Sequence, residues 1–225
     1  AVIVIDAFHF GERAPRGLDD IPAEFDPFDL GEDEYKKLDA KLRRQLPLGA
    51  RELGWAGTTW MGILYWDDSR CVDYLLSRPE VDPERIGATG LSIGAWRTNF
   101  LAALDRRVKA SVSCGWMSTG DAQQVHDLNG TVNVFGILPG VWDRLDVPDL
   151  AILAAPHAAM VMSNGKDPLF PPAAQEESAR QIRAGFEWAG CPERFGYVNL
   201  PKGHCYDVEL QEIAAGWFDR HLSPH

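Results

Sequence analysis

Short apolar runs alternate with longer amphipathic stretches along the chain. The first run, AVIVID at residues 1–6, is β-branched and ends on an acidic residue, which is typical of a strand buried on both faces of a parallel sheet. Residues 7–59 are rich in glycine, proline and charge around one helical patch, EDEYKKLDAKLRRQL. We expect this part to be a long excursion over the carboxyl edge of the sheet, where excursions commonly shape a site.

Helical spacing dominates the next part of the chain. Residues 62–77 place apolar side chains near one helical face, and Pro79 ends the pattern. The stretch DPERIGATG then turns into a strand, and apolar residues at helical spacing follow directly after Ser92: Ile93, Trp96, Phe100, Leu101 and Leu104. We therefore predict a strand that ends just before Ser92 and a helix that begins just after it.

Three further strands and two further helices continue this alternation. The stretches VKASVSC, AAMVMSN and FGYVNL predict strands at 108–114, 158–163 and 195–200. Apolar residues at helical intervals predict helices at 173–188 and 207–221.

Strands that alternate with helices indicate an α/β fold class, with a mostly parallel sheet covered by helices on both faces. The 225 residues can bury one sizeable core, and we find no internal repeat, low-complexity tract or linker. We therefore expect a single domain over residues 1–225.

The junction of the predicted strand and helix contains Gly90-Leu91-Ser92-Ile93-Gly94, a G-x-S-x-G pattern. A serine hydroxyl is a weak nucleophile near neutral pH, so it needs an imidazole to take its proton and a carboxylate to orient that imidazole. The flanking glycines would let the turn close tightly, so that the hydroxyl projects above the sheet edge beside a helix N-terminus. Ser92 is therefore the candidate nucleophile.

Two residues that follow later strands are candidates for the other roles. Asp167 in MVMSNGKDPLFP follows an apolar strand, and His204 in NLPKGHCYDVEL follows the last strand. Each has a simpler explanation when taken alone, since Asp-Pro is a common turn dipeptide and a loop histidine is commonly solvated. Together, the order Ser92, Asp167, His204 favours a catalytic triad. Asp121, which follows an earlier strand, is the alternative acid.

Composition narrows the range of partners. The net charge of -11 at pH 7 would repel nucleic acid and anionic membrane surfaces, and no basic cluster offsets it. No apolar run approaches the ~20 residues of a membrane-spanning helix, and the apolar start of the chain lacks the basic residues of a secretion signal. We therefore expect a soluble protein that binds neither nucleic acid nor membrane.

Cysteine and histidine positions argue against a metal site. The 4 cysteines lie far apart without a C-x-x-C spacing, so we expect buried free thiols rather than disulfides or metal ligands. His9, His126 and His157 share no metal-like spacing with one another or with carboxylates. We assign no metal and no cofactor.

Three parts of the chain carry a resemblance to a known family: RPEVDPERIGATGLSIGAWRTNFLAALDRRVKASVSCGWMST, LPGVWDRLDVPDLAILAAPHAAMVMSNGKDPLFP and the dipeptide GH. They resemble the acetyl-xylan-esterase-like and dienelactone-hydrolase-like branch of the α/β-hydrolase superfamily. The segment VIVIDAFHFGER resembles the strand and loop ahead of the nucleophile in that branch. The resemblance covers most of the chain and is most specific around Ser92. Ala95 departs from it, because many relatives have a second glycine there.

The resemblance implies Ser92 as nucleophile, Asp167 as acid and His204 as base, with the Ile93 N–H as one oxyanion donor. It also implies strands ahead of the one that resembles VIVID, and a loop after one of them that supplies a second donor. Loss of one such donor typically lowers turnover about 10²-fold or more. We therefore expect the chain to be the C-terminal part of a larger unit, completed by an upstream segment or a second chain.

Several aromatic and charged residues lie close to these motifs. Most tryptophans are expected in the core, but Trp116 and Trp142 follow the strand at 108–114, where lids and pocket walls occur. They are the candidate substrate-binding residues. Glu12 and Arg13 in FHFGER are explained more simply by a salt-bridged loop than by a place in the site.

We interpret the chain as a serine esterase that forms an acyl-enzyme at Ser92, with a small-molecule or carbohydrate ester, such as an acetyl ester, as its substrate. One alternative is a serine peptidase of the prolyl-oligopeptidase type, which resembles the chain around VDPERIGATGLSIG; the long FHFGERAPRGLDD excursion favours the esterase. The other is a non-catalytic binding module with the same fold, and an intact triad argues against it.

Overall fold

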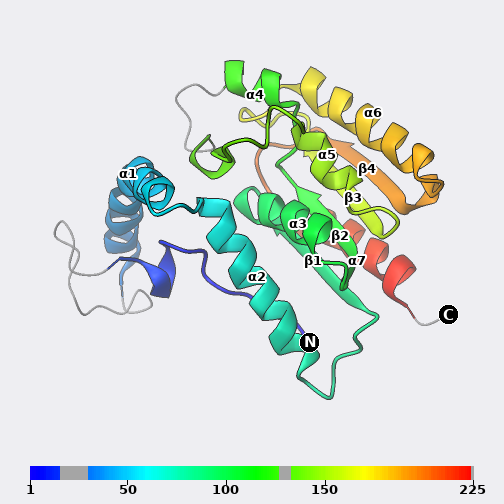
Figure 1. Ribbon diagram of the computed structural model, residues 1–225, viewed down its shortest axis with the longest axis horizontal. Helices are drawn as coiled ribbons and strands as arrows, with labels where there is room; N and C mark the ends of the chain where they lie inside the picture. The colour runs from blue at the N-terminus through cyan, green and yellow to red at the C-terminus, as the bar shows by residue number, and fades with distance from the viewer. Residues whose placement is uncertain (16–29, 127–132, 224–225) are drawn as a thin grey trace.

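The computed structural model describes residues 1–15, 30–126 and 133–223. At its centre is a parallel sheet with strand order β1-β2-β3-β4 (Figure 1). Its strands are β1 (Ile86–Leu91), β2 (Val108–Cys114), β3 (Ala158–Asn164) and β4 (Phe195–Leu200). β2 and β4 have the bounds that the sequence predicts, 108–114 and 195–200, and β3 continues one residue beyond the predicted 158–163, to Asn164. The α/β fold class is confirmed.

Helices cover both faces of the sheet, as predicted. One face is covered by α2 (Trp60–Leu76), α3 (Ile93–Leu104), α5 (Val147–Ile152) and α6 (Pro172–Trp188). On the other face, the described residues place α7 (Val208–Leu222) (Figure 1). The short helix α4 (Gly120–His126) follows β2. None of the described helices is both long enough and apolar enough to cross a membrane.

The residues of β3 contribute to the hydrophobic cores on both faces of the sheet. All of its residues are buried, which accounts for the continuous apolar run in the sequence. Met160 and Met162 pack with Trp217 of α7, whereas Val161 packs with the helices on the opposite face. This alternation is the period of two that a strand imposes on its side chains.

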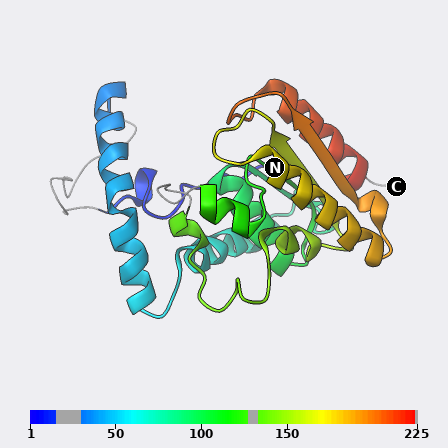
Figure 2. The same cartoon turned by 90° about the horizontal axis from the view of Figure 1, so that it is seen from above.

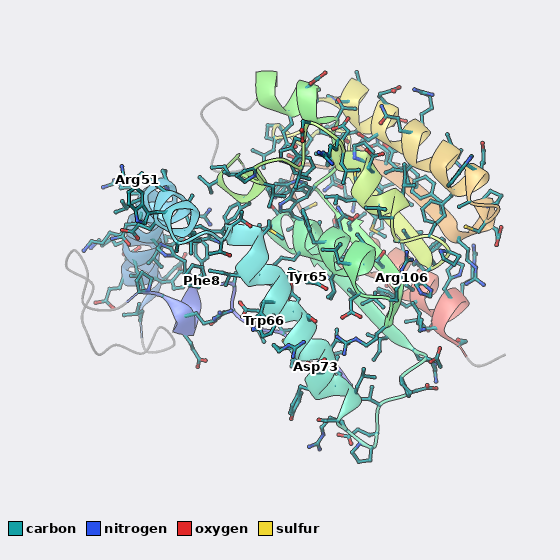
Figure 3. All side chains as sticks on the ribbon, viewed as in Figure 1. Phe8, Arg51, Tyr65, Trp66, Asp73 and Arg106 are labelled. Atoms are coloured by element: carbon teal, nitrogen blue, oxygen red, sulfur yellow. The ribbon has the colours of Figure 1, made fainter. Side chains whose placement is uncertain are left out.

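The long helix α1 (Glu32–Trp55) extends farther than the predicted helical patch. It continues through Pro47, and its buried residues are Leu42 and Leu46. The helix stands away from the sheet at one end of the molecule (Figure 2). Phe8 lies between α1 and α2 (Figure 3), where its ring packs edge-on against Trp60 with 5.4 Å between the ring centroids.

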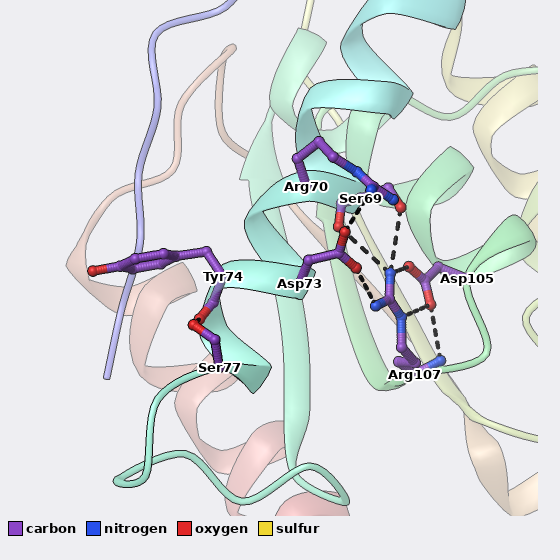
Figure 4. Close-up of polar contacts among 7 residues, drawn as sticks. All are labelled: Ser69, Arg70, Asp73, Tyr74, Ser77, Asp105 and Arg107. Carbon is purple, nitrogen blue, oxygen red and sulfur yellow. Dashed lines mark hydrogen bonds and ion pairs between the residues drawn. The ribbon is translucent and has the colours of Figure 1, made fainter.

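An ion-pair network joins α2 to the turn between α3 and β2 (Figure 4). The Arg107 guanidinium donates to both carboxylate oxygens of Asp105, at 2.8 and 2.6 Å, and to Asp73 of α2 at 2.5 Å. Burial alone would raise the pKa of Asp105, but the Arg107 guanidinium holds that pKa below its ordinary value. The pKa of Arg107 is raised in turn because the guanidinium donates to Asp105 and Asp73.

The strand predicted at residues 1–6 is not formed, which corrects the interpretation of AVIVID. Val2 and Val4 are 90% and 87% exposed. A cavity of about 460 Å³ lies between residues 1–5 and β1, lined also by residues of α2, α3 and α7. A strand forms only where another edge can pair its N–H and C=O groups. The cavity separates residues 1–5 from the edge of β1. Among the described residues, AVIVID therefore pairs with no strand.

Candidate active site

Ser92 occupies the junction between β1 and α3, where the sequence predicts a sharp turn. Its backbone has φ 56° and ψ -120°, and His9 is the other described non-glycine residue with a positive φ. A serine keeps this conformation only when the surrounding structure holds it there. Here the Ser92 N–H donates to the Cys114 carbonyl at 2.9 Å, and the Ser92 carbonyl accepts from the Trp96 N–H at 3.0 Å. The end of β2 and the first turn of α3 therefore hold the turn from two sides.

Gly90 makes this turn possible. A β-carbon at position 90 would lie 2.5 Å from the Gly94 carbonyl carbon, so a side chain there would force the start of α3 away from β1. At position 94, by contrast, a β-carbon would meet no described atom within 4 Å apart from its chain neighbours and the backbone of its own helix. The tight turn expected from the two glycines therefore depends on Gly90.

Ile93 opens α3, so its N–H has no partner inside the helix. The positive end of the helix dipole lies at the same place. Together these features favour negative charge beside Ser92.

Asp167 and His204 lie far apart in the sequence and meet through a short hydrogen bond. His204 Nδ1 lies 2.6 Å from Asp167 Oδ2, and the Asp167 side chain is 1% exposed against 26% for His204. Asp167 Oδ1 accepts the Leu169 N–H at 2.9 Å. The carboxylate therefore accepts a hydrogen bond within its own turn with one oxygen and contacts the imidazole with the other.

Backbone hydrogen bonds between two loops hold this pair together. Asp167 lies just beyond β3 and His204 just beyond β4, and these two strands pair in parallel. The Gly165 N–H donates to the Leu200 carbonyl at 2.7 Å, and the Lys166 N–H donates to the Lys202 carbonyl at 2.9 Å. The loops that carry the acid and the base are therefore one connected unit at the carboxyl edge of the sheet.

Gly115 is a site residue that the sequence reasoning missed. It follows β2 with φ 66°, and a β-carbon there would lie 3.4 Å from His204 Cε1 and 3.1 Å from Leu91 Cδ1. The His204 ring therefore packs against this glycine, beside the residue that precedes Ser92. The signal available in the sequence was a glycine directly after a predicted strand.

The structure thus brings Ser92, Asp167 and His204 to the same edge of one sheet. No hydrogen bond joins the side chains of Ser92 and His204 within the described ranges. In enzymes generally, hydrogen bonds between catalytic groups are often long before substrate binds and shorten in the complex. Chemically, the arrangement offers a hydroxyl, an imidazole that is oriented by a buried carboxylate, and a helix N-terminus.

A cavity of about 460 Å³ lies beyond the carboxyl end of β2, and three stacked indoles form one of its walls. Trp96 lies between Trp116, with 5.1 Å between ring centroids, and Trp142, with 5.9 Å. We call this cavity the tryptophan pocket and define it by Trp96, Trp116, Asp121, Gln123, Trp142 and Asp146. The structure therefore places the two predicted wall residues in one pocket. It also places the alternative acid, Asp121, in this pocket, whereas Asp167 is the carboxylate bonded to His204.

The cysteines are free thiols, of which Cys114 and Cys191 are buried, as predicted, whereas Cys71 and Cys205 are only partly buried. Burial raises the pKa of Cys114 to about 12, so this thiol stays protonated at neutral pH, and it donates to the Cys205 carbonyl at 3.5 Å. No group of three or more His, Cys, Asp or Glu residues in the described part of the chain could hold a metal ion. The side chain of His126 lies outside the described residues.

The FHFGER segment forms the salt-bridged loop that the sequence favours. Arg13 donates to Asp67 of α2 at 2.6 Å, and the Glu12 N–H donates to Asp6 at 2.8 Å. Residues 11–13 form a short 3₁₀ turn in this loop. These contacts tie the loop to α2.

No family model matches the chain, but two curated proteins of Bacillus subtilis (strain 168) are similar to it. "Putative hydrolase YtaP" is 25% identical over 178 residues, which cover 76% of this chain and 58% of that protein. "Uncharacterized peptidase YuxL" is 25% identical over 176 residues, which cover 70% of this chain and 26% of that protein. The chain therefore spans little more than half of the first relative and about a quarter of the second.

Two solved structures share the arrangement of sheet and helices. A carbohydrate esterase family 15 glucuronoyl esterase from Caldicellulosiruptor kristjansonii has a TM-score of 0.62 at 19% identity, over 73% of this chain and 51% of that one. A "putative acetyl xylan esterase" from Bacteroides fragilis NCTC 9343 has a TM-score of 0.61 at 15% identity, over 87% and 46%. At such identities the likeness concerns the fold, and the chain spans about half of each structure.

Proposed function

The chain has the α/β-hydrolase fold, and we propose that it is a serine hydrolase that cleaves carboxylic esters through an acyl-enzyme. One observation carries the proposal: the 2.6 Å contact between His204 Nδ1 and Asp167 Oδ2 lies at the sheet edge that also holds the strained turn at Ser92. The order Ser, Asp, His along the chain is the order of the triad in this fold.

In the first half of the proposed reaction, Ser92 Oγ attacks the ester carbonyl carbon while His204 Nε2 takes the hydroxyl proton. Asp167 accepts the Nδ1 hydrogen, which fixes the tautomer with a free Nε2 and stabilises the imidazolium that forms. The Ile93 N–H donates to the oxygen that becomes negatively charged. The tetrahedral intermediate then collapses, His204 returns the proton to the leaving alcohol, and the acyl group stays on Ser92.

In the second half, water replaces the alcohol. His204 takes a proton from the water as it attacks the acyl carbon, and the acid leaves as Ser92 Oγ recovers its proton. Every proton transfer in this scheme uses the same imidazole. The scheme uses the chain's own residues and calls for no cofactor.

Esters of carbohydrates, acetyl esters among them, are the substrate class we favour. The two solved structures carry names of carbohydrate esterases, glucuronoyl and acetyl xylan esterase. The second candidate function is peptide hydrolysis by the same residues, and it is favoured by the similarity to YuxL, which is named a peptidase.

We also infer that a further polypeptide segment completes the sheet. The cavity between residues 1–5 and β1 lies in line with the sheet, between α3 on one face and α7 on the other. An unpaired strand edge beside exposed Val2 and Val4 is the kind of edge that proteins normally cover. A segment in this cavity would run up to Gly94, close to Ser92, where the resemblance to the superfamily implies a second oxyanion donor.

Labelling with a fluorophosphonate probe tests the proposed function. The probe should modify Ser92, and Ser92→Ala should abolish both the labelling and the hydrolysis of 4-nitrophenyl acetate, whereas the exposed Ser77→Ala should change neither. An adduct on Ser118 or Ser163 would contradict the assignment, and an unlabelled folded protein would support a binding module. Faster cleavage of a peptide amide than of the ester would favour the peptidase.

A further inference from the structure

Two residues that line the tryptophan pocket, Trp96 and Trp116, are linked to residues of the proposed active site, although Ser92, Asp167 and His204 do not line the pocket themselves. Trp116 follows Gly115, against which the His204 ring packs, and the Trp96 N–H donates to the Ser92 carbonyl. Trp142 is held at the far side of the stack by a 2.6 Å hydrogen bond from its Nε1 to the Gly136 carbonyl. The pocket volume of about 460 Å³ lies within the ~300–1,000 Å³ that small-ligand sites span. The pocket is therefore large enough to accept part of a substrate.

The charged groups that line this pocket are acidic. Asp121 and Asp146 line it, and none of its described lining residues is a lysine, arginine or histidine. Asp146 Oδ1 accepts the Gly120 N–H at 2.6 Å and the Val147 N–H at 2.7 Å, which holds this carboxylate in the wall. Asp121 forms no ion pair with another described residue. Two carboxylates without a cation in a concave site produce a local negative potential.

Gln123 offers a polar group to a ligand. It is 7% exposed and lines the pocket, and its side-chain amide makes no hydrogen bond to another residue in the described ranges. Its polar atoms are not among the buried atoms that lack a partner, so the amide stays accessible. A hydroxyl or carbonyl group of a ligand in the pocket can therefore bond to this amide.

We propose that the tryptophan pocket receives an uncharged polar part of the ester substrate and excludes an anionic one, with Asp121 as the residue that determines this charge selectivity. The inference rests on the proposed function. Gln123 can donate to and accept from hydroxyl groups, and the two carboxylates accept hydroxyl hydrogens but repel another carboxylate.

Two matched pairs of esters test the proposal on the whole protein. On the acyl side, 4-nitrophenyl butyrate is compared with 4-nitrophenyl hemisuccinate; on the alcohol side, methyl 4-acetoxybenzoate is compared with 4-acetoxybenzoate. After correction for their alkaline hydrolysis rates, we expect kcat/KM for the anionic member of at least one pair to be about tenfold lower. Asp121→Asn should raise the anionic-to-neutral ratio of that pair about 3- to 10-fold.

Asp143→Asn is the matched control. It removes the same charge close by from a residue that is exposed, as Asp121 is. Asp143 does not line the pocket, so the ratio should stay unchanged. Equal rates within both pairs, or equal effects of the two substitutions, would overturn the proposal while leaving the proposed function intact. If Ser92→Ala hydrolyses the neutral esters as fast as the wild type, the proposed function fails, and the inference that rests on it fails as well.

Discussion

The His204 ring packs against Gly115 so closely that a β-carbon at position 115 would lie 3.4 Å from His204 Cε1. The two residues belong to loops that follow different strands, β2 and β4. The position of the proposed base therefore depends on the absence of a side chain on a neighbouring loop, and not only on its bond to Asp167.

Gly115→Ala should lower turnover about tenfold or more, because a displacement of about 1 Å at a reacting group already has a large effect on rate. The added methyl group would press on the His204 ring, and alanine at φ 66° would also lower the free energy of unfolding by about 1 kcal/mol. Ester kinetics and urea unfolding measure the two effects. Gly190→Ala is the control, because Gly190 has φ +75° with no described atom within 4 Å of its β-carbon position. Equal turnover in the two variants would contradict this account.

Asp167→Asn should leave the fold intact and lower kcat by about 10³- to 10⁴-fold. The amide would donate to Nδ1 and favour the tautomer whose Nε2 carries a hydrogen, so the imidazole could no longer take the Ser92 proton. Circular dichroism checks the fold and ester hydrolysis checks the rate. Full activity in Asp167→Asn, together with a loss in Asp121→Asn, would transfer the role of acid to Asp121.

Gly90→Ala should destabilise the protein by about 1–3 kcal/mol or more and reduce fluorophosphonate labelling of Ser92. The cause is the close approach of Gly94, whose carbonyl carbon would lie 2.5 Å from the new β-carbon. Gly94→Ala is the matched comparison within the same motif, since it adds a methyl group where no described atom lies within 4 Å apart from its chain neighbours and the backbone of its own helix. Thermal unfolding of both variants tests this, and a Gly94→Ala variant as unstable as Gly90→Ala would refute the explanation.

Asp105→Asn should reduce the free energy of unfolding at pH 7 by about 1–2 kcal/mol, because Arg107 loses a charge-assisted partner. The pKa of Asp105 is lowered in the folded protein. Ionised Asp105 therefore adds to the free energy of unfolding at any pH above its pKa in the unfolded chain, and this addition is lost as the pH falls through its pKa in the folded protein. Urea unfolding from pH 7 down to pH 3 should therefore show the wild type and the variant converging at low pH. If the difference in free energy of unfolding between the wild type and the variant grew as the pH fell, the stabilising role of ionised Asp105 would be contradicted.

The cavity beside β1 predicts a further segment that pairs with that strand. Intact mass spectrometry and denaturing gels of the natural protein should show either a polypeptide larger than 25.0 kDa or a second chain that purifies with it. The physical reason is that exposed valines and an unpaired strand edge favour aggregation until they are covered. A single monomeric species of 25.0 kDa that is active on a simple acetyl ester would show that no further segment is needed.

Local periodicity determined most of the secondary structure. The helical spacing after Ser92 and the runs VKASVSC, AAMVMSN and FGYVNL correspond to α3 and to β2, β3 and β4. These patterns succeed because side chains that alternate or recur along one segment reflect which face of that segment is buried. The G-x-S-x-G motif belongs to the same class of information, since strand, turn and helix are contiguous in the chain.

Contacts between distant segments were decided by the tertiary structure alone. AVIVID has the composition of a buried strand, but a strand needs a second edge, and a sequence pattern does not show whether an edge lies within reach. Asp121 and Asp167 both follow strands, and only the parallel pairing of β3 with β4 decides that Asp167 bonds to His204. The same holds for Gly115 and for the stacked indoles of the tryptophan pocket, because packing depends on the path of the whole chain and not on any one segment.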